Sequence, residues 1–104
     1  MTQEQKLKIN FILKRDNSVV DFDSDKIVVA IEKALKESGE YKEGLANDLS
    51  NQVVKKIRDN HQEEGSIPSV ESIQDMVEIV LMDNELHITA KSYILYRERH
   101  AELR

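Results

Sequence analysis

Three cations near the N-terminus are spaced in a way that favours a binding site for phosphate. Lys14 and Arg15 end an apolar stretch, and Lys26 falls in the first turn of a helix that we expect to begin near Ser24, with Asp23 as its N-cap. The dipole of a helix attracts anions to its N-terminus, so a cation there is mildly unfavourable for the helix itself. The position of Lys26 therefore indicates a negatively charged ligand, and phosphate is the obvious candidate.

The residue types also suit this role. Arg makes bidentate contacts with phosphate, whereas Lys neutralises it as a point charge. Lys14 and Arg15 are neighbours on an expected strand and so face opposite sides. They converge only where the strand end twists or where both wrap around one phosphate chain. The competing interpretation is that all three are ordinary surface cations, as most Lys and Arg residues are.

These cations lie where an expected β-hairpin meets the first helix. The pattern predicts a strand over 8–15, a turn at Asn17, which tolerates a positive φ, and a returning strand over 19–22. Ile67 is a candidate for a brief third strand beside the hairpin. Apolar residues at helical spacing then predict four helices, over residues 24–38, 42–62, 70–82 and 86–103.

Three residues are expected to bound these helices, with Asp23 and Ser69 as N-caps and Gly39 as a C-terminal stop. The last helix is apolar around most of its circumference, so we expect it to lie deepest. A hairpin followed by four helices gives an α+β fold, in which the N-terminal β-hairpin, a small β-sheet, caps a four-helix bundle.

The composition excludes several classes of protein. The 104 residues are expected to form a single domain, with 1–7 as a flexible polar tail. A net charge of −5 argues against nucleic acid as a partner, and the absence of cysteine excludes a disulfide framework. No apolar run has the ~20 residues of a membrane span, so we expect no membrane partner and a cytoplasmic location. His61, His87 and His100 lack metal-ligand spacing, and no carboxylates are paired for acid–base catalysis, so we expect neither a metal site nor an enzyme.

Two blocks of the sequence carry a family resemblance. The first reads Ile12-Leu13-Lys14-Arg15-Asp16-Asn17, then Phe22-Asp23 and Lys26-Ile27; the second reads Val70-Glu71-Ser72-Ile73-Gln74-Asp75-Met76-Val77-Glu78, then Ala90-Lys91-Ser92-Tyr93-Ile94-Leu95-Tyr96-Arg97. In this order and at this separation they resemble the ATP-cone, a regulatory nucleotide-binding module found at the N-terminus of many ribonucleotide reductases. The resemblance spans nearly the whole chain. It departs from the family at Asn17, where Gly is usual, and Asn is a residue that such turns accept.

The resemblance implies a set of ligand contacts. Phosphates would be bound by Lys14, Arg15, Lys26, Arg97 and Arg99. Adenine and ribose would be bound by Ile12, Val20, Phe22, Ile27, Ile73 and Gln74. Each group has a competing interpretation. The apolar residues could simply pack in the core, and Gln74 could be a solvated residue on a helix surface. The two C-terminal arginines could compensate a helix dipole without any ligand. Val20 stands where some cones carry a carboxylate that recognises the adenine amino group, which leaves that contact to backbone groups.

The resemblance also implies a function. The chain would be an allosteric regulatory domain that binds ATP or dATP and controls the overall activity of a ribonucleotide reductase, with the anaerobic and cobalamin-dependent types favoured. Mg²⁺ would enter with the nucleotide, the partner would be a catalytic domain or subunit, and dATP would favour an inhibited assembly through self-association. The two nucleotides differ by one ribose hydroxyl, so the difference must be read near the sugar, around Gln74. The alternative is a degenerate cone that serves as a helical protein–protein interaction module without nucleotide binding.

Overall fold

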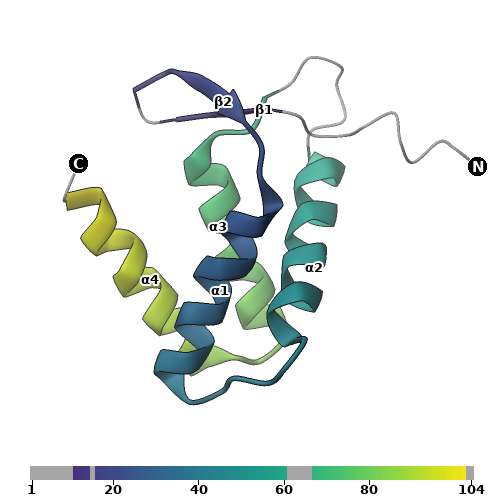
Figure 1. Ribbon diagram of the computed structural model, residues 1–104, viewed down its shortest axis with the longest axis vertical. Coiled ribbons are helices and arrows are strands. Elements are labelled where there is room, and N and C mark those ends of the chain that lie inside the picture. Colours follow the sequence, from purple (N-terminus) through teal and green to yellow (C-terminus); the bar gives the residue numbers. More distant parts are fainter. Residues whose placement is uncertain (1–10, 15, 61–66, 103–104) are drawn as a thin grey trace, which may run out of the picture.

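The structure has a hairpin followed by four helices, which confirms the predicted α+β class. The computed structural model of the chain describes residues 11–14, 16–60 and 67–102, the last three of these by their backbone alone. The elements in order are β1 (Phe11–Leu13), β2 (Val19–Asp21), α1 (Ser24–Ser38), α2 (Leu45–Asn60), α3 (Val70–Asp83) and α4 (His87–Glu102). The hairpin lies across one end of the helices (Figure 1). None of the described helices combines the length and apolar character that a membrane span requires.

The hairpin turn forms as predicted around Asn17. Phe11 pairs with Asp21 and Leu13 with Val19 in the antiparallel ladder. The amide of Asn17 donates to the Lys14 carbonyl at 2.9 Å, and Asn17 takes a φ of 70°, which confirms the expected positive value. This turn positions Lys14 directly after the last residue of β1. Arg15 lies outside the described residues.

A side chain also stabilises the turn. The Asp16 carboxylate accepts hydrogen bonds from the amide of Ser18 at 3.0 Å and from its hydroxyl at 2.7 Å. The hydrogen bond from the Ser18 side chain, followed by that from its backbone, lowers the pKa of Asp16 below its ordinary value. These contacts stabilise the turn on either side of Asn17, which itself tolerates the left-handed conformation that the turn requires.

The segment before α3 is joined to the hairpin, but not through Ile67. The predicted third strand at Ile67 is wrong: an isolated bridge pairs Leu13 with Ser69 instead, and the Leu13 amide donates to the Pro68 carbonyl at 2.9 Å. Pro68 has no amide hydrogen to donate, so its carbonyl alone takes part in the pairing. The bridge sets the start of α3 directly against β1.

The helix boundaries follow the predicted capping residues. The Asp23 side chain accepts from the Asp25 amide, Ser69 accepts from the Ser72 amide, and Gly39 ends α1 with a φ of 82°. α2 begins at Leu45 rather than at the predicted residue 42, because Gly44 has a φ of 82° and forms a turn just before it.

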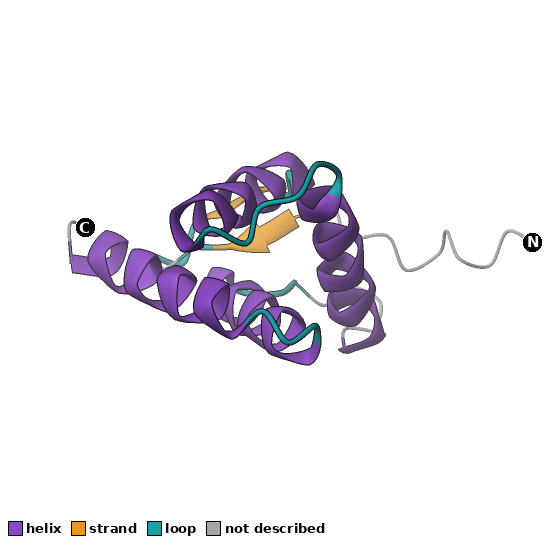
Figure 2. Cartoon of the chain, turned by 90° about the horizontal axis from the view of Figure 1, so that it is seen from below, coloured by secondary structure: helices purple, strands orange, loops and turns teal. Residues whose placement is uncertain are grey.

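α4 does not lie deepest, which corrects the expectation from its apolar pattern. Its buried side chains are Thr89, Ala90 and Tyr93, whereas Ile88 is 60% exposed and Leu95 is 50% exposed. α4 packs against α1 and α3, at the side of the bundle (Figure 2). The centre of the core is instead formed by fully buried residues of α1, α2 and α3, namely Ile31, Leu35, Leu49, Val53 and Val80.

Candidate functional site

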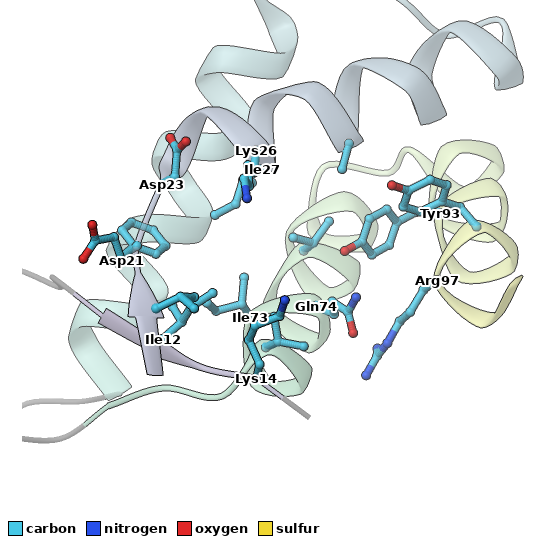
Figure 3. A pocket seen from close by; sticks show the side chains of 16 residues that line it. Ile12, Lys14, Asp21, Asp23, Lys26, Ile27, Ile73, Gln74, Tyr93 and Arg97 are labelled. Carbon is cyan, nitrogen blue, oxygen red and sulfur yellow. The ribbon is translucent and has the colours of Figure 1, made fainter. Parts of the chain in front are cut away.

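A pocket of about 530 Å³ lies between the hairpin, α1, α3 and α4 (Figure 3). The hairpin and the segment that follows it contribute Ile12, Lys14, Val20, Asp21, Phe22 and Asp23. The helices contribute Lys26, Ile27 and Ala30 from α1, Val70, Ile73, Gln74 and Val77 from α3, and Tyr93, Tyr96 and Arg97 from α4. α2 contributes no lining residue. The walls of the pocket are therefore formed by one segment that precedes α2 in the sequence and one that follows it.

The pocket brings together two of the predicted phosphate-binding cations. Lys14 and Lys26 are exposed and approach the pocket from opposite sides (Figure 3). Lys26 stands in the first turn of α1, so the helix N-terminus and both ammonium groups face one space. The carboxylates of Asp21 and Asp23 point away from the middle of the pocket. An anion between the two lysines therefore meets mainly positive charge.

Every residue predicted to surround the adenine lines the same pocket: Ile12, Val20, Phe22, Ile27 and Ile73. Ile27 and Ile73 also belong to the buried core, whereas Ile12 and Phe22 pack against it and are half-buried. Adenine binding and core packing are thus not exclusive interpretations of these residues, because the apolar wall of the pocket is the surface of the core.

Gln74 has an unused acceptor at the pocket wall. Its Oε1 is buried and, among the described residues, is the single buried side-chain nitrogen or oxygen without a hydrogen-bond partner. Buried polar atoms are normally paired, and an exception requires an explanation such as a missing ligand. Gln74 is one of the polar residues that reach the interior of the pocket (Figure 3).

Arg97 faces the pocket but already has partners on α3. Its Nη1 donates to Asp75 Oδ1 at 2.9 Å and to Glu78 Oε2 at 2.6 Å, and its Nη2 donates to the Glu71 carbonyl at 3.5 Å. Desolvation works against the charge, but the hydrogen bonds to Glu78 and Asp75 outweigh it, so the pKa of Arg97 is raised above its ordinary value. Arg99, in contrast, is exposed and does not line the pocket.

Two tyrosines of α4, Tyr93 and Tyr96, also line the pocket, although no ligand contact was predicted for them from the sequence. Tyr93 is 4% exposed, and its ring centroid lies 6.1 Å from that of Tyr96. Burial raises the pKa of Tyr93 well above its ordinary value, so its hydroxyl stays protonated and is able to donate. Their spacing of three along a helix was the available signal, but the same spacing is typical of a core.

The described residues offer little to a metal ion on their own. No group of three or more His, Asp or Glu residues within the described ranges is placed to hold one. A divalent cation in this pocket would have to take most of its ligands from a bound anion and from water.

The sequence is similar to a known family and to several known proteins. The family described as the ATP cone domain matches residues 10–102. The vitamin B12-dependent ribonucleoside-diphosphate reductase of Thermoplasma acidophilum is 41% identical over 103 residues, which cover 92% of this chain and 12% of that protein. The alpha subunit of the ribonucleoside-diphosphate reductase of Chlamydia muridarum is 35% identical over 101 residues, 89% of this chain and 10% of that subunit. The vitamin B12-dependent reductase of Mycobacterium tuberculosis is 36% identical over 93 residues, 89% of this chain and 13% of that protein. The chain thus spans a small part of the length of the curated relatives it matches.

Proposed function

The chain belongs to the ATP-cone family, and from this premise we propose that it binds ATP or dATP in the pocket and thereby regulates a ribonucleotide reductase in the cytoplasm. The observation that carries the proposal is the union of two lysines and a helix N-terminus with an apolar slot in one pocket. Its volume of about 530 Å³ lies within the range of pockets that bind small molecules.

The chemistry of the walls suggests how the nucleotide would lie. The base would occupy the slot formed by Ile12, Phe22 and Ile73, and the phosphates would run between Lys14 and Lys26 towards the N-terminus of α1. Arg15 and Arg99 stay predicted phosphate contacts, because the first is outside the described residues and the second is outside the pocket lining.

The chain would act as a regulator rather than as a catalyst. Its partner would be the catalytic domain or subunit of a reductase, since the relatives that it matches are named as reductases and are much longer. Two of the three relatives described above are named as vitamin B12-dependent, which supports the cobalamin-dependent type as the parent. ATP and dATP would compete for one pocket, and dATP would favour the larger, inhibited assembly.

A thermal-shift and calorimetric titration tests the proposal directly. ATP at a hundred times its dissociation constant is expected to stabilise the fold by ~2.7 kcal/mol, which is a shift of several degrees for a domain of this size. GTP is expected to stabilise it less, because the slot is apolar and fits a base with few polar groups. Equal shifts with both nucleotides would show that the pocket does not recognise the base. No shift with either would favour the alternative function, a protein–protein interaction module with the cone fold.

Gln74 is expected to discriminate between ATP and dATP. Its unpartnered Oε1 would accept a hydrogen bond from the ribose 2′-hydroxyl, which only ATP carries. In the Gln74→Met protein, the ratio of the ATP and dATP dissociation constants is expected to move towards one. The free energy of unfolding of the nucleotide-free protein should stay equal or rise by about 1 kcal/mol, because a buried unpaired acceptor has been removed. An unchanged ratio in calorimetry would place the recognition of the ribose elsewhere.

A further inference from the structure

Arg97 is in an unusual electrostatic position for a residue that lines an anion pocket. One guanidinium is paired with two carboxylates, those of Asp75 and Glu78, which do not themselves line the pocket, so the cluster beside this wall of the pocket carries a net negative charge. A phosphate chain that approaches it meets repulsion as long as both pairs are intact. The two lysines of the lining, Lys14 and Lys26, have no such pairing among the described ion pairs.

The same ion pairs join α4 to α3 where packing is thin. Beyond Tyr93, none of the described side chains of α4 is buried, and Arg97 itself is 20% exposed. The C-terminal end of α4 diverges from the other helices (Figure 1). The contacts of Arg97 with Asp75 and Glu78 therefore help to hold this end of α4 against α3.

We propose that Arg97 is a gated phosphate ligand, which the carboxylates of α3 hold in the empty pocket and which the phosphate chain of a bound nucleotide takes over. This inference rests on the proposed function, because it needs a nucleotide in the pocket. A guanidinium binds phosphate in the same bidentate manner as carboxylate, so the exchange preserves the kind of hydrogen bond that Arg97 makes.

The two carboxylates would respond differently to the loss of Arg97. The Asp75 side chain is 57% exposed, so water replaces its partner readily. Glu78 is 20% exposed and 2.6 Å from Nη1, so its release from Arg97 is the main obstacle to the exchange. Once Arg97 has moved to the phosphate, α4 loses a link to α3, and occupation of the pocket is transmitted to the C-terminal half of α4.

Substitution of Glu78 tests the inference, because the inference predicts an increase in ATP affinity rather than a loss. In the Glu78→Gln protein, the affinity for ATP is expected to rise about tenfold, equivalent to 1.4 kcal/mol, because Arg97 is released and a repulsive charge is gone. The affinity for adenosine, which has no phosphate, is expected to stay unchanged. Asp75→Asn should act in the same direction with a smaller effect, and it is a second variant that alters a mostly exposed side chain. Arg97→Met is expected to weaken ATP binding and to abolish the gain when it is combined with Glu78→Gln.

Asp59→Asn is the matched control, because it removes one carboxylate from an exposed ion pair with Lys55 on α2, outside the pocket. It should leave the affinity for ATP unchanged. A wild-type or lower ATP affinity in both Glu78→Gln and Asp75→Asn would overturn the inference, as would an Arg97→Met protein that loses stability but not ATP affinity. In those cases wild-type binding of ATP would leave the proposed function standing. A wild-type protein that binds neither ATP nor adenosine would remove both.

Discussion

Replacing Lys14 and Lys26 together by alanine is expected to weaken ATP binding by a factor of roughly 10² to 10⁴, because each charge-assisted hydrogen bond contributes about 1.5–3 kcal/mol. Both side chains are exposed, so the fold should persist. Adenosine binding should change little, since the slot for the base is intact. Calorimetry with ATP and adenosine on the same protein separates the two contributions.

Although this variant should bind ATP more weakly, its free energy of unfolding without nucleotide should increase. Lys26 stands in the first turn of α1, where its charge opposes the helix dipole, so its removal is expected to stabilise the empty domain by about 0.3–1 kcal/mol. Lys55→Ala with Lys56→Ala is the control, because it removes the same charge from α2, which does not line the pocket. Wild-type ATP affinity in the Lys14, Lys26 variant, or an equal loss for adenosine, would contradict the phosphate assignment.

Filling the pocket with a larger side chain is expected to weaken ATP binding about as much as removal of the two lysines does, without any change of charge. Ala30 lies on the α1 wall, and a phenylalanine there would project into the space that the nucleotide needs. The Ala30→Phe protein is expected to lose affinity for ATP and adenosine alike, by about 100-fold or more, which is roughly 2.8 kcal/mol. Equilibrium dialysis or calorimetry with both ligands gives the measurement.

The control for this variant is Asn51→Phe on α2, which places the same aromatic side chain at an exposed helical position outside the pocket. It should bind ATP and adenosine like the wild type. Urea denaturation of both proteins would show whether Ala30→Phe remains folded. If the Ala30→Phe protein is folded and binds ATP like the wild type, the nucleotide does not occupy this pocket, whatever the lysines do.

The features that could be predicted from the sequence are those set by local chemistry. Asp23, Ser69 and Gly39 bound their helices as expected, because a cap depends on a few neighbouring atoms. The positive φ of Asn17 follows equally from the requirements of a tight turn. The positions of Lys14 and Lys26 already indicated a phosphate site, whereas the adenine and ribose contacts came only from the family motif; the pocket lining includes these residues and Arg97 but not Arg99.

The features that could not be predicted depend on how the helices pack. The pairing of Arg97 with Asp75 and Glu78 joins two helices, and neither helix's periodicity indicates it. α4 is apolar on several sides, which suggested burial, yet it packs on α1 and α3 and leaves Ile88 and Leu95 exposed. Hydrophobic pattern alone does not tell a buried helix from one at the side of a bundle.

Because of the bridge between Leu13 and Ser69, the pocket forms only when segments far apart in the sequence have packed together. Through this bridge, the wall formed by the hairpin and the wall formed by α3 are parts of one hydrogen-bonded unit, although α1 and α2 separate them along the sequence. A ligand that contacts both walls is therefore expected to disfavour every local opening that separates the hairpin from α3. Bound nucleotide should consequently slow proteolysis throughout the domain, including in α2, which it does not touch.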